Sequence, residues 1–170
     1  MKTSKNLKFK AGFSLMEILV VLFIVSTAML GIVSLIIQNI QVQSINKNNL
    51  IASSLAQEGI ELIRNVRDNN WKNNNDFDTN LSDGFYRIDY RGGVPVYDNS
   101  AAKIYLKDGF YMHDNGGDIG LTPTIFNRQI AVVKLTTEIG QPLKVKSIIS
   151  WIDHNHLYRY ELQTLLYDWR

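Results

Sequence analysis

A single acidic side chain at the start of a long apolar segment is the residue in this sequence most able to do chemistry. Glu17 precedes twenty residues without a charge, Ile18 to Ile37. A carboxylate at the centre of a membrane costs about 2.5 to 3.5 kcal/mol, and less near the surface. Among packed apolar helices it would need a cation, because an unpaired buried charge shifts its pKa or destabilises the structure. Glu17 is therefore either one half of an ion pair or an interfacial acid that reaches the lipid headgroups.

Other residues do not assemble into a catalytic or metal-binding pattern. The absence of cysteine excludes disulfides, thiolate metal sites and a cysteine nucleophile. His154 and His156 flank one turn residue without an evident third ligand, so a turn is favoured over a metal site. The stretch from Asp114 to Asp118 lacks the spacing and the glutamate of an EF-hand, which favours an ordinary loop. We therefore expect no enzyme activity, no cofactor and no metal.

The element that would position Glu17 is the apolar segment itself. Twenty residues at about 1.5 Å each match a hydrocarbon core of roughly 30 Å. Its interruptions are residues that membrane helices tolerate: Ser26, Thr27, Gly31 and Ser34. The lysines of the first ten residues precede it: Lys2, Lys5, Lys8 and Lys10. By the positive-inside rule this cluster stays in the cytoplasm and the remainder of the chain lies outside.

The entrance to the apolar segment carries a recognisable order of residue types: basic residues, Gly12, and then Phe13-Ser14-Leu15-Met16-Glu17. This order resembles the signal shared by type IV pilins and the pseudopilins of type II secretion. The resemblance implies a leader, residues 1–12, that a prepilin peptidase removes after Gly12. It also implies N-methylation of the new first residue, Phe13, by the same enzyme.

The resemblance further implies what the processed chain does. It would be a structural subunit of a type IV pilus or a secretion pseudopilus, held first in the inner membrane with an extracytoplasmic head. Other subunits would be its partners through the N-terminal helix, with Glu17 paired to the α-amino group of a neighbour. The filament would then lie on the cell surface, as a pilus, or in the periplasm, as a pseudopilus.

Two other interpretations of the N-terminus stay open. A secretory signal peptide could end at Ser26-Thr27-Ala28, but the apolar run continues from Met29 to Ile37 beyond that cut. An uncleaved single-span anchor is the other interpretation. Either would leave an extracytoplasmic binding or adhesin domain, secreted or tethered to the membrane.

The apolar segment is predicted to continue into an amphipathic helix, so that one helix runs over residues 13–69, with residues 13–37 in the membrane or filament core. Proline is absent between Phe13 and Val94. Many type IV pilins have a proline within the apolar stretch, and this chain has none there. The predicted packing face consists of Ile45, Ala52, Leu55, Ala56, Gly59, Leu62, Ile63 and Val66. A glycine costs roughly 1 kcal/mol in a helix, so Gly59 on this face predicts the close approach of a strand.

Charged and amide side chains lie opposite that face and are expected to be solvated. They are Lys47, Gln57, Glu58, Glu61, Arg64 and Asp68. Glu61 and Arg64 are spaced to form an ion pair, and so are Arg64 and Asp68. The helical sequence, Ser54 to Asp68 with Trp71, and the chain's last hairpin are similar to minor pilins of the pilus-modification subgroup.

The rest of the chain, residues 70–170, is predicted to form a β-rich head. An Asn- and Asp-rich loop at about 70–84 ends the helix. The predicted strands are Phe85 to Arg91, Lys103 to Lys107, Phe110 to His113, Arg128 to Ile139, Leu143 to Ile152 and Leu157 to Tyr167. The predicted fold class is α+β and pilin-like, with the C-terminal half of the helix packed on an antiparallel sheet.

Net charge gives little support for nucleic-acid binding. The whole chain carries +2. Without residues 1–12 it would carry 14 basic and 16 acidic residues, a net charge of −2. We therefore expect no specific nucleic-acid partner.

Overall fold

The computed structural model describes residues 12, 14–91, 96–97, 102–136 and 141–168. The chain is α+β, with one long helix followed by an antiparallel sheet. Helix α1 spans Leu15–Lys72 without interruption, 58 residues. The chain divides into two structural units, residues 1–46 and 47–170, and α1 contributes to both.

The first unit contains the apolar part of α1. Every residue from Leu15 to Gln43 is exposed, although most are large and apolar. In the part of the chain that the structure describes, α1 is the one helix long and apolar enough to cross a membrane. The hydroxyls of Ser26 and Thr27 donate to the carbonyls of Phe23 and Ile24, at 2.9–3.0 Å. Their polar groups are thus satisfied within the helix, as hydrocarbon surroundings require.

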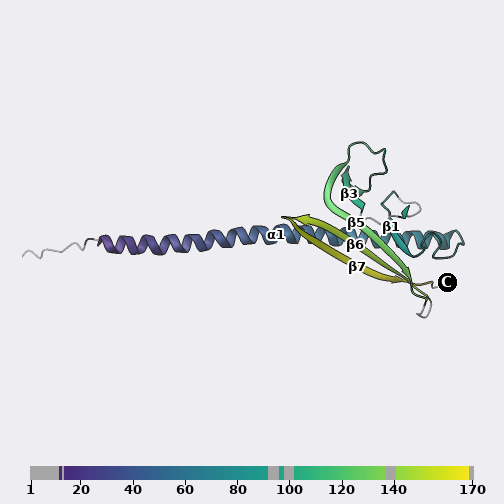
Figure 1. Ribbon diagram of the computed structural model, residues 1–170, viewed down its shortest axis with the longest axis horizontal. Coiled ribbons are helices and arrows are strands. Elements are labelled where there is room, and N and C mark those ends of the chain that lie inside the picture. The colour runs from purple at the N-terminus through teal and green to yellow at the C-terminus, as the bar shows by residue number, and fades with distance from the viewer. Residues whose placement is uncertain (1–11, 13, 92–95, 98–101, 137–140, 169–170) are drawn as a thin grey trace, which may run out of the picture. The chain divides into compact units, whose positions relative to one another are not determined.

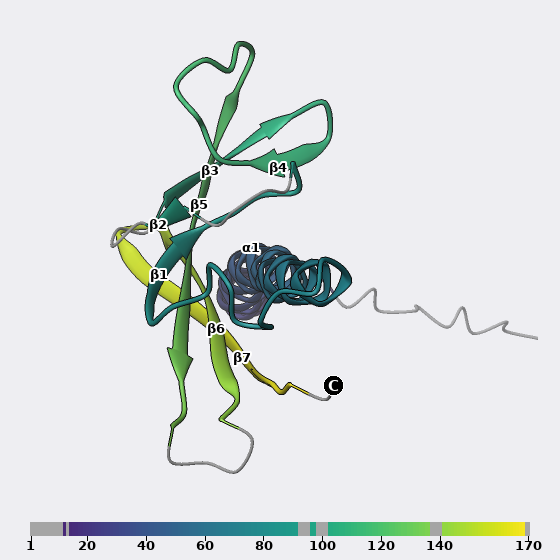
Figure 2. The same cartoon turned by 90° about the vertical axis from the view of Figure 1, so that its right-hand side faces the viewer.

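The second unit contains a seven-stranded antiparallel sheet, drawn in Figures 1 and 2. Its strands are β1 (Gly84–Arg87), β2 (Val96–Tyr97), β3 (Ala102–Lys107), β4 (Phe110–Met112), β5 (Thr122–Lys134), β6 (Leu143–Asp153) and β7 (His156–Leu166). β5 is the strand that joins the sheet's parts, since it pairs with β1 and β3 on one side and with β6 on the other. β7 continues the sheet beyond β6.

One face of the sheet packs on the part of α1 that belongs to this unit, as Figure 2 shows. Near the β6–β7 turn, Trp151 and Phe126 pack against the small side chains of Ala52 and Ala56. Toward the other ends of these strands a larger cluster surrounds Ile63. Its remaining buried members are Ile60, Trp71, Phe77, Leu81, Tyr86, Ile88, Ile130, Val132, Leu143, Val145 and Leu166.

The prediction for Gly59 is confirmed. A methyl group on this residue would lie 2.5 Å from the Oγ of Ser147, which belongs to β6, and 3.3 Å from its Cβ. The separation is far below van der Waals contact. Glycine is therefore what allows the helix backbone to approach the sheet at this point.

The ends of several elements differ from the prediction. The helix continues to Lys72, and β2 has no counterpart among the predicted strands. The strand predicted over Arg128 to Ile139 instead spans Thr122–Lys134, and residues 137–140 lie outside the described part of the chain. Pro123 pairs with Tyr105 of β3, but the pairing of β5 with β6 begins only at Phe126, so the proline lies where β5 is paired on one side only, as edge positions allow.

The prediction that the charged face of the helix is solvated is wrong at one residue. Glu58 forms an ion pair with Arg128, a fully buried side chain of β5. The predicted pair of Glu61 and Arg64 is confirmed. Asp68, however, pairs with its neighbour Arg67, at 2.8 Å, rather than with Arg64.

Candidate functional site

The structure places Glu17 in the first turn of α1. The carbonyl of Ser14 accepts from the backbone N–H groups of Glu17 and Ile18, at 3.0 and 3.2 Å, and so begins the helix. A carboxylate in the first turn is favoured there because the helix dipole is positive at its N-terminus. The sequence thus forms a helix start that presents its one acid at the head of the apolar segment.

The surroundings of Glu17 are open and apolar. The side chain borders a shallow hollow of about 290 Å³ whose other walls are Ile18, Val21 and Leu22. Gly12 is exposed, and a side chain added to it would meet nothing within 4 Å. Phe13 lies outside the described residues. Gly12 and Glu17 are therefore both exposed in the described part of the chain.

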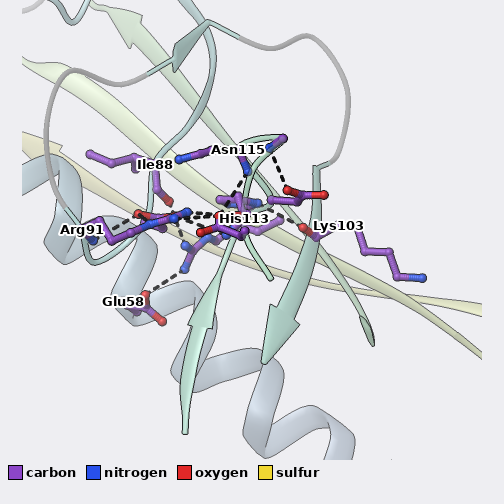
Figure 3. A network of polar contacts seen from close by, with 11 residues as sticks. Glu58, Ile88, Arg91, Lys103, His113 and Asn115 are labelled. Carbon is purple, nitrogen blue, oxygen red and sulfur yellow. Dashed lines mark hydrogen bonds and ion pairs between the residues drawn. The ribbon is translucent and has the colours of Figure 1, made fainter. Parts of the chain in front are cut away.

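A second group of polar side chains lies in the head, between α1 and the sheet (Figure 3). Arg91 joins its parts: its guanidinium donates to Asp89 at 2.6 Å, to Asp118 at 2.8 Å and to the carbonyl of His113 at 2.6 Å. The N–H of His113 donates to Asp89 at 3.3 Å. These bonds fasten the loop after β4 to the segment that follows β1.

The charges in this cluster shift one another's pKa values. Burial would raise the pKa of Asp89, but hydrogen bonds from Arg91 and His113 outweigh it and hold the pKa below its ordinary value. Hydrogen bonds to Asp89 and Asp118 raise the pKa of Arg91. The pKa of His113 falls to about 4, first because the ring is buried and then because Arg128 lies near it. His113 is therefore neutral at pH 7 while its neighbours are charged.

Arg128 is the deepest charge in the cluster, with 1% of its side chain exposed. Its guanidinium donates to the carbonyl of Ile88 at 2.8 Å and to that of Leu55 at 3.4 Å. Glu58 contributes a carboxylate oxygen at 3.4 Å. Burial lowers the pKa of Arg128, and the charge of Glu58 opposes that shift. These bonds are all internal to the head, but two buried nitrogens of the group, the Nε of Arg128 and the Nε2 of His113, have no hydrogen-bond partner among the described residues.

The other candidates for chemistry remain separate. His154 contacts Asp153 at 2.7 Å in the exposed β6–β7 turn. The carboxylates of the loop at 114–118 serve internal bonds: Asp114 accepts from the N–H of Gly116, and Asp118 accepts from Arg91. Among the described residues, no three His, Cys, Asp or Glu side chains gather as a metal site would require.

Sequence reasoning missed this polar cluster but contained a signal for one of its members, Arg128. Arg128 lies two residues from Phe126 and from Ile130 and so shares a strand face with them and with Val132, which are all apolar and all buried on the inner face of β5. That spacing places residue 128 on the inner face. Its partners come from distant segments and share no such pattern.

Comparisons with protein-family models, with curated proteins and with solved structures found no match to this chain.

Proposed function

We propose that this chain is the precursor of a structural subunit, of minor-pilin type, in a type IV pilus or a related secretion pseudopilus. One observation carries the proposal. The residues Gly12-Phe13-Ser14-Leu15-Met16-Glu17 lead into the first turn of helix α1, where the uncharged run from Ile18 to Ile37 follows and is exposed throughout. A prepilin peptidase would cut after Gly12 and methylate Phe13.

The exposed helix supports assembly as well as anchoring. A soluble protein rarely leaves so many apolar residues without a partner. Lipid covers such a surface before assembly, and the helices of other subunits cover it afterwards. The same residues thus serve in the inner membrane and in the filament core.

The position of Glu17 supports the pairing that assembly needs. Cleavage after Gly12 creates a new α-amino group, and N-methylation keeps its positive charge. Within a bundle of apolar helices, that cation on one subunit would neutralise Glu17 of its neighbour. The carboxylate and the amine would therefore select the stagger between adjacent subunits.

The mass of the mature N-terminal peptide tests the proposal. The chain would be expressed in a host with a prepilin peptidase and, as a control, in the same host without that enzyme. We expect a mature chain that begins at methylated Phe13 in the first host and an intact leader in the second.

Two other masses would contradict the proposal. An intact leader in both hosts would make the chain an anchored extracytoplasmic domain. A chain that begins at Met29 would make it a secreted one.

A further inference from the structure

We infer that Arg128 and Gly59 together fix the axial position of helix α1 on the sheet of the head. Gly59 lies against Ser147, where no side chain fits without a shift. Arg128 lies beside it, with its Cδ 3.4 Å from the position that a Cβ of residue 59 would take. The inference concerns the head alone and holds whether or not the chain enters a filament.

The need for such a device follows from the helix itself. Apolar residues recur on its packing face every three or four positions, so a shift by about one turn again presents apolar side chains to the sheet. Apolar packing therefore selects which face of the helix meets the sheet, but it selects the position of the helix along its own axis less strongly. A polar contact that only one position can make adds the missing selectivity.

The glycine rejects most of the neighbouring positions by steric conflict. A shift of the helix by one turn would put Leu55, Leu62 or Ile63 where Gly59 now lies, depending on its direction and size. Each of these side chains would overlap Ser147 of β6. A shift of three residues, or about 4.5 Å, would instead bring Ala56 to the place of Gly59. Its side chain is the smallest of the four, so this shift meets the least steric conflict.

Arg128 rejects that remaining position by its charge. The three-residue shift would put Leu55 in the place of Glu58, beside the guanidinium. Arg128 would then lose its carboxylate while remaining buried, which is strongly unfavourable for a charge. In the observed position the guanidinium has Glu58 at 3.4 Å and two backbone carbonyls as acceptors.

This role is separable from a contribution to stability. Replacing a buried charge by an apolar side chain of similar size is often neutral or stabilising. If Arg128 selects position, its replacement by methionine leaves a folded head in which α1 occupies two positions. If Arg128 is only a tolerated buried charge, the replacement leaves one position.

The distance between two spin labels distinguishes these outcomes. The chain contains no cysteine, so cysteines at Asn65 and His156, both exposed, would carry the only labels. His156 lies at the end of the sheet that packs near Ala52, so the line between the labels runs along the helix. The full-length chain in detergent is expected to give a single distance.

We expect R128M to add a second distance that differs by up to about 4.5 Å, in on the order of a tenth of the molecules. E58Q should do the same, because Arg128 then has a carboxylate in neither position. R67M is the matched control: Arg67 is also buried and also ion-paired, but its partner is the adjacent Asp68, and a single distance is expected.

A single, unchanged distance in both R128M and E58Q would overturn the inference. Glu58 is one-third exposed, so E58Q is expected to fold even where R128M does not, and it then decides alone. A second distance in R67M as well would also overturn it, because any weakening of the head would then loosen the helix.

Discussion

The two parts of helix α1 have the same backbone structure and opposite surroundings. From Leu15 to Gln43 every residue is exposed, whereas nine residues between Ala52 and Trp71 are buried. The first part is more apolar, yet no described residue of its own unit covers it. The second part has fewer apolar residues, and the sheet covers one face of them. The apolar residues of one helix therefore have two placements: they are exposed in the first part and form the core of the head in the second.

The largest expected effect comes from Glu17→Gln. This variant tests whether the first part of α1 can be impaired while the stability of the head stays unchanged. If the carboxylate pairs with a neighbour's α-amino group, this variant is processed normally but is absent from assembled filaments. Sheared filaments and membranes would be compared by immunoblot. Normal incorporation of the variant would contradict the ion pair, and a changed melting temperature of the head would contradict the separation of the two parts.

An identical substitution in each part measures the difference in packing directly. Ile63→Ala removes a fully buried side chain and should lower the free energy of unfolding of the head by about 2 to 5 kcal/mol. Ile24→Ala removes an exposed one and should change it by less than about 0.5 kcal/mol. Urea unfolding of the full-length chain in detergent, followed by tryptophan fluorescence, gives both values. Equal losses would mean that the two parts unfold as one.

Of the two parts, only the head should lose stability as the pH falls from about 6.5 to 4. His113 has its pKa lowered to about 4 in the folded chain, so the unfolded chain binds this proton first and gains stability relative to the folded one. The shift in the pKa of His113 from 6.5 to about 4 corresponds to roughly 3 kcal/mol in the free energy of unfolding. This contribution is present in full above pH 6.5 and is lost as the pH approaches 4. The charges that face the ring are Asp89, Arg87 and Arg128.

His113→Asn provides the control for this pH dependence. Asparagine can still donate to the carbonyl of Lys103, which lies 3.2 Å from the Nδ1 of the histidine, but it does not titrate. Urea unfolding at pH 7, 5.5 and 4 should show a shallower loss in the variant. The same slope in both proteins would assign the loss to the carboxylates instead.

The smallest effect is expected from the glycines of the two parts. Gly59→Ala must displace Ser147, which outweighs the gain in helix propensity and should cost roughly 1 kcal/mol. Gly31→Ala meets nothing within 4 Å and should leave the unfolding of the head unchanged. Adding Ser147→Ala should restore the Gly59→Ala variant, because it removes the obstructing hydroxyl. If Ser147→Ala does not restore the stability of the Gly59→Ala variant, the Ser147 hydroxyl is not the cause of the loss.

The sequence predicted those features that depend on local pattern. The long helix follows from the apolar run and the absence of proline, and the close approach at Gly59 follows from a glycine on a packing face. The ends of β6 and β7 were predicted to within one residue, because alternation and turn residues mark them. The early start of β5 was missed, because Pro123 is disfavoured in a strand that is paired on both sides.

Features that depend on distant residues were not predictable from these patterns. The polar network joins Glu58, Asp89, Arg91, His113 and Arg128, which no spacing relates to one another. The pairing of β1 with β5 likewise brings together residues more than forty positions apart. Glu17 is the reverse case: its neighbourhood is evident in the sequence, but its expected partner belongs to another molecule.

The order of elements along the chain has a consequence for biosynthesis. The helix face that packs on the sheet is synthesised first, and Trp151, which covers Ala52, follows 99 residues later. At about 5 to 20 residues per second, that face stays uncovered for roughly 5 to 20 seconds. β6 and β7, the strands that complete the cover, are the last to emerge. The nascent chain thus has a period in which the packing face of α1 has been made and the strands that cover it have not.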